Sequence, residues 1–243
     1  MRLLFDDFGT IAHRVEIGSV TLAGDAPGYD HPCAVVPAGD WQPLTEREAK
    51  RLRPDPATPP GVVVELVARR LPEFDPGDLD GRRRHAAALD PLEGRWPREL
   101  LACADSLHGQ ATTTCDVHNG GRRIGLHVDN FDRLPYPGRL RSRRRLCLNL
   151  GPGTRWLLVC DCTITGICRA LGRDQAGHLP HTDDVRAYVT GGHPLRCLRI
   201  RLEPGEGYIA PTEVLPHDGS TADADTWSCA AFWLGYPSRK ATA

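Results

Sequence analysis

The sequence predicts an α+β protein with a mainly β core, organised as a β-sandwich or jelly roll, and an N-terminal helical extension. Two observations support this prediction. The hydrophobic period is helical in several stretches before about residue 111 and changes to two residues after it. The later apolar runs are short and separated by turn signals rich in Gly and Pro, which is typical of strands joined by tight loops. We therefore expect seven or eight strands with helices packed outside them.

The first 110 residues combine extended and helical patterns. Val15–Leu22 predicts a strand. Thr45 and Glu48 form a Thr-x-x-Glu capping box at the start of one helix. Residues 72–95 are rich in Pro, Gly and charge and predict a loop around a short helix. Helices are expected at Leu44–Arg53, Val62–Leu71 and Trp96–Leu107.

The second half predicts most of the sheet. Strands are expected at Thr112–Val117, Arg123–Val128, Arg145–Leu150, Arg155–Cys160, Val185–Val189, Leu195–Leu202, Gly207–Ala210 and Trp227–Leu234. A chain of 243 residues lies within the size range of one β-rich domain. We therefore predict a single domain, in which residues 1–110 support a catalytic core formed by residues 111–236.

Composition excludes several classes of function. With 30 Lys+Arg against 31 Asp+Glu, the formal net charge is −1, which removes the electrostatic reason to expect nucleic acid or a membrane surface as partner. Nine cysteines occur without regular spacing, and acids at Asp6 and Asp7 interrupt any apolar signal peptide. We expect a cytoplasmic protein with reduced thiols and a small-molecule substrate, while its oligomeric state stays open.

The most informative motif is His127-Val-Asp129, followed far downstream by His217. Alternation along a strand places positions 127 and 129 on one face, so an imidazole and a carboxylate can meet the same ion. Two histidines and one carboxylate form a facial set that leaves open positions, as in non-haem Fe(II) oxygenases. His181 and Asp183 form a second such pair, but they lie in a polar stretch close to His217, so the first pair is favoured.

Three segments make the chain similar to the Fe(II)/2-oxoglutarate-dependent dioxygenases. They are Ile124–Asn130, Arg145–Gly151 and Leu202–His217, within a likeness that covers about residues 111–236. The resemblance implies a double-stranded β-helix, the cupin-like jelly roll, and assigns iron to His127, Asp129 and His217. It also implies 2-oxoglutarate and O₂ as co-substrates for hydroxylating a C–H bond.

The chain departs from that family at the co-substrate. Members commonly carry an arginine about ten residues after the distal histidine, whereas this chain has Thr226–Cys229 there. Another strand could supply the cation, or the co-substrate is not 2-oxoglutarate. The candidates that we expect to bind it are Arg145, Asn149, Arg155 and Ser228. Arg145 and Asn149 share a strand face, and a solvated edge strand is an equally good interpretation of that face.

These features predict an iron enzyme with no catalytic residue beyond its metal ligands. We expect oxidation of an amino acid or a natural-product intermediate. An iron oxygenase independent of 2-oxoglutarate and a jelly-roll binding module without turnover stay open as alternatives. Cys160, Cys162 and Cys168 lie close together in the sequence but form no paired Cys-x-x-Cys, so we interpret them as buried free thiols.

Overall fold

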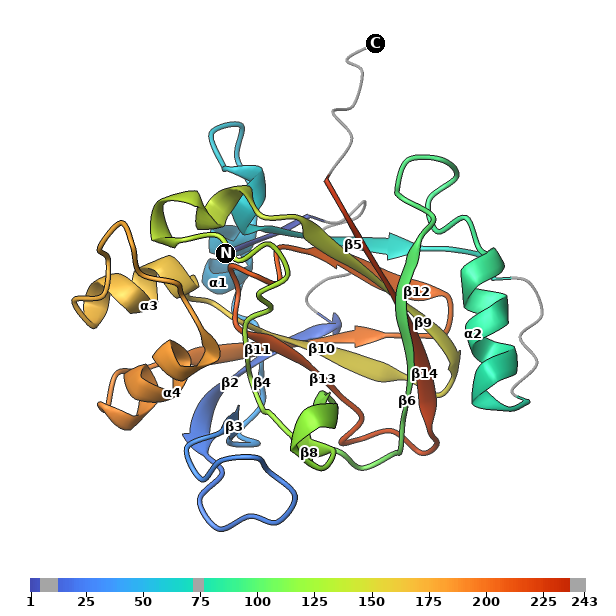
Figure 1. Cartoon of the computed structure of the whole chain (residues 1–243), viewed down its shortest axis with the longest axis horizontal. Coiled ribbons are helices and arrows are strands. Elements are labelled where there is room, and N and C mark those ends of the chain that lie inside the picture. Colours follow the sequence, from blue (N-terminus) through green and yellow to red (C-terminus); the bar gives the residue numbers. More distant parts are fainter. Residues whose placement is uncertain (5–12, 72–76, 237–243) are drawn as a thin grey trace.

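The computed structural model describes residues 1–4, 13–71 and 77–236, in which strands outnumber helices (Figure 1). The strands are β1 (Arg2–Leu4), β2 (Val15–Leu22), β3 (Val35–Pro37), β4 (Gln42–Pro43), β5 (Val63–Ala68), β6 (Leu100–Ser106), β7 (Cys115–Asp116), β8 (Arg122–Arg123), β9 (Arg144–Pro152), β10 (Arg155–Cys160), β11 (Arg196–Leu202), β12 (Glu206–Ala210), β13 (His217–Ser220) and β14 (Ser228–Gly235). The helices are α1 (Glu46–Leu52), α2 (Leu79–Ala88), α3 (Ile164–Ala170) and α4 (Thr182–Thr190). Within these described residues, every helix is too short or too polar to cross a membrane.

Two mainly antiparallel sheets organise the molecule. The first has the order β1-β5-β12-β9-β14-β6, with only β1 and β5 running parallel. The second has the order β13-β10-β11-β2-β3, and β4 pairs with β2 beside it. The chain passes repeatedly between them: β9 lies in the first sheet, β10 and β11 in the second, β12 in the first, β13 in the second and β14 in the first.

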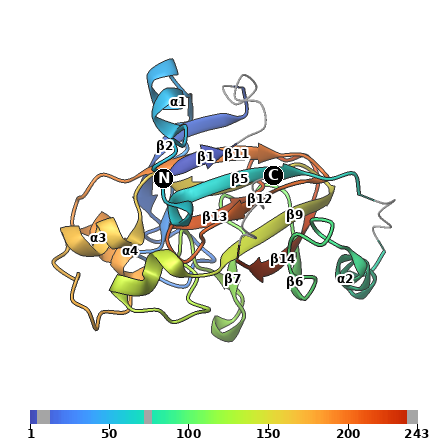
Figure 2. The ribbon, with the colours of Figure 1, turned by 90° about the horizontal axis from the view of Figure 1, so that it is seen from above.

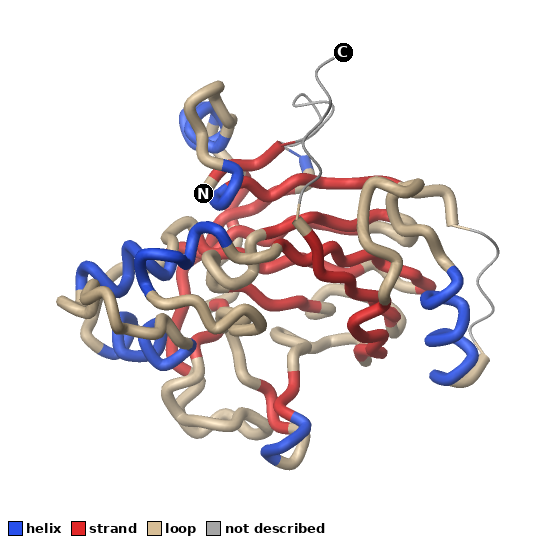
Figure 3. The backbone as a smooth tube through the Cα atoms, turned by 45° about the horizontal axis from the view of Figure 1, so that its top comes forward, coloured by secondary structure: helices blue, strands red, loops and turns tan. Residues whose placement is uncertain are grey.

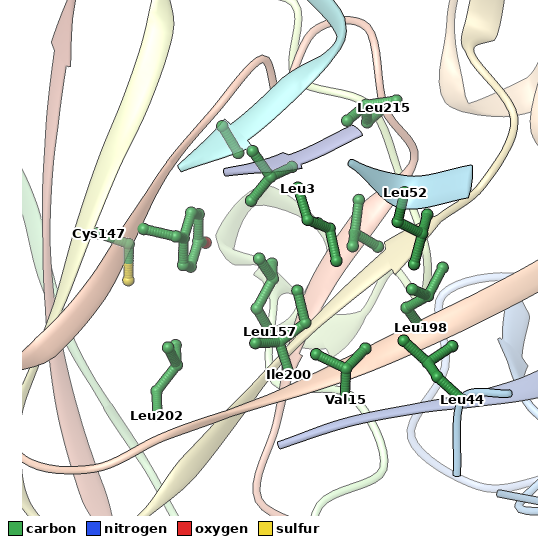
Figure 4. Close-up of a cluster of buried hydrophobic side chains, with 14 of the residues drawn as sticks. Leu3, Val15, Leu44, Leu52, Cys147, Leu157, Leu198, Ile200, Leu202 and Leu215 are labelled. Carbon is green, nitrogen blue, oxygen red and sulfur yellow. The ribbon is translucent and has the colours of Figure 1, made fainter. Parts of the chain in front are cut away.

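A shared hydrophobic core joins the two sheets, which confirms the mainly β prediction and is consistent with a β-sandwich (Figure 4). Leu3 and Cys147 come from the first sheet, and Leu157, Leu198 and Ile200 come from the second. All five side chains are fully buried. The space between the two sheets is therefore the interior of the protein. Polar groups that are buried there need hydrogen-bond or charge partners.

Alternation along β9 decides which of its side chains enter that interior. Three leucines pack on the outer face of the first sheet, namely Leu146, Leu148 and Leu150. Cys147 belongs to the core between the sheets, and Arg145 and Asn149 occupy alternate positions on the same face. The predicted polar face of this strand therefore points inward, and it is not a solvated edge because β12 and β14 flank β9 on both sides.

Helices α2, α3 and α4 cover the outer faces of the sheets, whereas Leu52 of α1 joins the core between them. α2 packs beside β6 and β14, where Ala86 joins the core outside the first sheet. α3 and α4 pack together over the second sheet, where Ile167 and Val185 belong to the same buried cluster as Leu158 and Cys160 of β10. Figures 2 and 3 show α2 and the α3–α4 pair at opposite ends of the molecule.

Two helices predicted in the first half are wrong. Val62–Leu71 contains β5, which pairs with β12, and Trp96–Leu107 contains β6, which pairs with β14. A short apolar run fits either a helix or a strand, and here the neighbouring strands decide. The first half therefore contributes strands to both sheets. The predicted helix at Leu44–Arg53 is confirmed as α1, with its capping box between Thr45 and Glu48.

Other predictions also need correction. The strand expected at Val185–Val189 is wrong, because that segment lies in α4, which His181 caps. Thr112–Val117 and Arg123–Val128 form only the short pieces β7 and β8 and two isolated bridges, one at Arg123 and one at His127. The strands expected at the positions of β9, β10, β11, β12 and β14 are confirmed. The short helix predicted within the loop of residues 72–95 is likewise confirmed as α2, and the first five residues of that range lie outside the described chain.

Candidate metal centre

His127 and His217 lie side by side because their two segments pair at this point. An isolated antiparallel bridge joins them, with hydrogen bonds of 3.0 Å from His127 N–H to the His217 carbonyl and 2.9 Å in the reverse direction. The centroids of the two imidazole rings are 4.6 Å apart, and both side chains are buried. The structure thus brings together the two histidines that the sequence selected.

Backbone carbonyls orient both imidazoles. His127 Nδ1 lies 2.9 Å from the Gly125 carbonyl oxygen, and His217 Nδ1 lies 3.0 Å from that of Leu215. Gly125 has a φ of +78°, and a Cβ there would lie 2.5 Å from the Val35 carbonyl oxygen, so this turn requires glycine. An imidazole that donates from Nδ1 keeps a free lone pair on Nε2, which is how metal-binding histidines are usually held.

Asp129 completes the cluster from the next position on the same face. Its Oδ1 lies 3.8 Å from His127 Nε2 and its Oδ2 3.8 Å from His217 Nε2, and the candidate donor atoms all lie within 4.8 Å of one another. Burial raises the pKa of Asp129, but the surrounding positive charge, chiefly that of Arg145, outweighs it and lowers that pKa to about 2. Burial and Arg145 hold the pKa of His217 well below its usual range. The site therefore offers a carboxylate and a neutral imidazole at neutral pH.

Arg139, which sequence reasoning missed, holds the backbone beside this cluster. Its fully buried guanidinium donates to the carbonyl oxygens of Asp129 at 2.5 Å and of Glu213 at 2.7 Å. Arginine is so frequent in this chain that a single one carried little signal. Asp218 was also missed, although its Oδ2 lies 3.8 Å from His127 Nδ1. Burial raises the pKa of Asp218.

Arg145 lies directly against the candidate ligands. Its Nη1 is 3.1 Å from Asp129 Oδ2, its Nη2 contacts His217 Nε2, and its guanidinium carbon is 5.2 Å from the centroid of the Phe232 ring. Burial lowers the pKa of Arg145, but the charge of Asp129 outweighs it and raises that pKa, so the group stays a cation. Arg145, which the sequence predicts as a residue that binds the co-substrate carboxylate, thus already pairs with a carboxylate of the chain itself.

The residues fit a metal ion after two rearrangements, one of the ligands themselves and one of Arg145. Asp129 Oδ2 is buried and accepts no well-oriented hydrogen bond from the described chain. Bonds of about 2.1 Å at right angles place neighbouring donors about 3 Å apart, so the His–Asp pairs would need to approach by less than ~1 Å. The lone pair of His217 Nε2 cannot serve a metal and Arg145 at once. The guanidinium must therefore leave Nε2 when a metal binds.

Arg155, on β10, forms a second polar centre in the interior. It is 4% exposed, its Nη1 is buried without a hydrogen-bond partner, and within residues 1–4, 13–71 and 77–236 no carboxylate forms an ion pair with it. A Cβ on Gly219 would lie 2.5 Å from both Arg155 Nη2 and Thr113 Oγ1, so glycine leaves room for the guanidinium. Gly219 lies two residues after His217 on β13, which is one strand repeat, or about 7 Å along the strand. A buried cation without an acid is costly unless an anion joins it.

Ser228 and Asn149, the other predicted co-substrate residues, differ in their hydrogen bonding. The Ser228 hydroxyl is buried and has no hydrogen-bond partner among the described residues. The Asn149 amide donates to the carbonyls of Gly153 at 2.9 Å and Leu202 at 3.1 Å, and it accepts from Gly151 N–H at 3.0 Å. A ligand would have to compete with these bonds at Asn149, whereas the Ser228 hydroxyl has none to break.

The alternative pair faces solvent. The side chains of His181 and Asp183 are 57% and 71% exposed, at the N-terminus of α4. Neither joins the cluster of His127, Asp129 and His217. The preference for the pair at positions 127 and 129 therefore agrees with the geometry.

Comparison of the chain with protein-family models, curated proteins and solved structures finds no match among them. The resemblance carried by the three sequence segments thus stays a prediction. The function must be inferred from the chemistry of these side chains.

Proposed function

We propose that this protein is a non-haem Fe(II) oxygenase that uses 2-oxoglutarate and O₂ to hydroxylate, or otherwise oxidise, a C–H bond of a small molecule. The observation that carries the proposal is the convergence of two imidazole nitrogens and one carboxylate from His127, Asp129 and His217 in the buried interior. Nitrogen and oxygen donors in this combination suit Fe(II) and leave positions open for a co-substrate and O₂.

The strand order supports a jelly roll of the double-stranded β-helix type. The strands that follow the His127 segment alternate between β12-β9-β14 in one sheet and β13-β10-β11 in the other. The bridge between His127 and His217 adds the His127 segment beside β13. In such a fold the metal ligands lie at one end of the interior between two sheets.

The unpaired Arg155 supports 2-oxoglutarate as the co-substrate. A guanidinium offers two parallel donors that match a carboxylate, and such charge-assisted pairs are strong when buried. The guanidinium lies beside Gly219, which is one strand repeat, ~7 Å, along β13 from His217, a span that a five-carbon dicarboxylate can bridge. Ser228 offers an unused buried hydroxyl. Arg155 and Ser228 are therefore the residues that we assign to the distal carboxylate.

Each side chain then has a defined task. His127, Asp129 and His217 would hold the iron, which when bound supplies the O₂ activation that protein side chains lack. Arg139 fixes the backbone of Asp129 through its hydrogen bond to the carbonyl oxygen. The core that includes Cys147 excludes water from the reacting atoms.

Two further candidate functions each have an observation in their favour. Arg145 already neutralises Asp129 and contacts His217, as expected if the interior is a metal-free binding site. The region after His217 carries no arginine on β14, as expected if an iron oxygenase takes its electrons from the substrate alone.

The test is a calorimetric titration of the protein with Mn(II), an air-stable substitute for Fe(II), followed by 2-oxoglutarate. We expect 2-oxoglutarate to bind only to the metal-loaded protein. Glutarate, which has both carboxylates but no oxo group, is the matched ligand control and should bind more weakly. Metal binding without 2-oxoglutarate binding would favour the 2-oxoglutarate-independent oxygenase. Absence of metal binding would favour the binding module.

A further inference from the structure

A second group of metal-binding side chains lies outside the sandwich interior. Cys168 is in α3, Asp184 is in the first turn of α4, and His178 is in the loop between them. Their candidate donor atoms all lie within 4.8 Å of one another. Cys168 and Asp184 are buried, while the His178 side chain is 24% exposed. Three separate elements thus deliver sulfur, nitrogen and oxygen to one point.

The carboxylate of Asp184 is the centre of this group. Its Oδ2 lies 2.9 Å from His178 Nε2 and 3.6 Å from Cys168 Sγ. Its Oδ1 accepts a hydrogen bond of 2.7 Å from Arg173. The arginine thereby fixes one oxygen, while the other faces the histidine and the thiol and also accepts a hydrogen bond of 2.9 Å from His181 N–H.

We propose that Cys168, His178 and Asp184 bind Zn²⁺. Thiolate, imidazole and carboxylate are the three ligand types that zinc accepts, and a thiolate selects zinc over harder cations such as Mg²⁺ or Ca²⁺. No fourth donor of the described chain joins the group. The exposed edge of His178 admits a water molecule to the fourth position of a tetrahedral site. The nitrogen and oxygen donors of the first centre have no thiolate, so the two sites select different metals.

The zinc would join the α3–α4 unit to the segment that carries the first centre. Thr182, two residues before Asp184, accepts a hydrogen bond of 3.3 Å at its hydroxyl from Val128 N–H. Val128 lies between the candidate ligands His127 and Asp129. The loop from Leu171 to His181 contains no helix or strand, so cross-linking it to both helices would hold the start of α4 in place. The site therefore has a structural role in positioning the first centre.

The same contacts describe a metal-free alternative. In it, the Cys168 thiol and the His178 ring donate to Asp184, whose carboxylate also accepts from His181 N–H in the capping box of α4. The two arrangements differ in whether sulfur is bonded to a metal, and that difference is directly measurable.

The first experiment measures zinc per chain in protein purified from zinc-supplemented medium, in a His217→Ala background that removes the first centre. We expect a single zinc that survives dialysis, and its loss in Cys168→Ser. Cys162→Ser is the matched control and should retain the metal, because Cys162 Sγ lies near the Thr163 carbonyl and not in the cluster. His178→Gln, at a partly exposed position, should lose zinc while keeping the fold, which covers the case that Cys168→Ser fails to fold.

The second experiment replaces zinc by Co²⁺ and records the near-ultraviolet spectrum. A thiolate-to-cobalt charge-transfer band should appear in the His217→Ala protein and disappear in the His178→Gln and Cys168→Ser variants of it. A protein that retains no zinc and shows no such band would overturn the proposal and establish the hydrogen-bonded cap. A band that persists in Cys168→Ser would also overturn it, since another thiol would then hold the metal.

Discussion

The two polar centres of the interior each bury an arginine, and only one of these arginines is paired. Arg145 lies 3.1 Å from a carboxylate oxygen of Asp129, whereas Arg155 has no acid partner in the described parts of the chain. A paired buried cation belongs to the fold, because removing it leaves an uncompensated charge. An unpaired one costs free energy in the ligand-free protein and is explained by an anion that binds later. Burial alone therefore does not reveal the role of an arginine here.

The largest expected effect comes from removing a ligand at the first centre. His217→Ala should lower the affinity for Fe(II) or Mn(II) by at least about 100-fold, since losing even an outer partner of a metal ligand costs about 10–100-fold. Equilibrium dialysis measures it. His193→Ala, at an exposed histidine, is the control and should bind as the wild type does. Equal metal affinity in the His217→Ala and His193→Ala variants would show that His217 does not bind the metal.

The next largest effect is on stability. Arg145→Met should reduce the free energy of unfolding of the metal-free protein by about 3–5 kcal/mol, because Asp129 is left buried without its partner. Urea denaturation measures it. Added Mn(II) should restore more stability to this variant than to the wild type, since the metal replaces the missing charge and no longer competes with the guanidinium for His217. A variant as stable as the wild type would show that the pair with Asp129 does not compensate either charge.

The same substitution at the other arginine should act in the opposite direction. Arg155→Met should leave the ligand-free protein as stable as the wild type or more so, because it removes an unpaired buried charge. Affinity for 2-oxoglutarate should fall about 100-fold, within the range for truncating a buried charge pair. Calorimetry and urea denaturation measure the two effects. Arg201→Met, on neighbouring β11, is the control, because that exposed arginine pairs with Glu203. A large loss of stability in Arg155→Met would show that Arg155 stabilises the fold, as Arg145 does, and that the two arginines do not differ in role.

The smallest expected effect is at Ser228. Ser228→Ala removes one neutral hydrogen bond to the co-substrate, which is worth about 0.5–1.5 kcal/mol, so affinity for 2-oxoglutarate should fall by about tenfold at most. Stability should not change, because the hydroxyl has no partner among the described residues. Calorimetry on the metal-loaded variant measures the affinity. Affinity equal to that of the wild type would exclude Ser228 from the binding set.

Strand alternation predicted the parts of the site that depend on local geometry. It placed His127 and Asp129 together and gave β9 one leucine face and one polar face. It failed at Val62–Leu71 and Trp96–Leu107, where the partners that make these segments strands lie far along the chain in β12 and β14. A short apolar run does not carry that information.

The roles of the arginines also depend on distant partners. Both Arg145 and Arg155 are candidates from the sequence, and nothing in the sequence shows which of them has an acid partner. Only the folded arrangement brings Asp129 to Arg145 and leaves Arg155 facing Gly219. The cluster of Cys168, His178 and Asp184 was not predicted from the sequence for the same reason. Its three residues meet only when the loop that carries His178 folds back between two helices.

The most direct test of the proposed function is an anaerobic optical titration of the metal-free protein with Fe(II), followed by 2-oxoglutarate. A weak visible charge-transfer band should appear only when both are present, and it should be absent from His217→Ala. In Arg155→Met the band should require a far higher concentration of 2-oxoglutarate. A protein that binds iron but never develops the band would contradict the 2-oxoglutarate assignment, and a protein that binds no iron would contradict the metal centre itself.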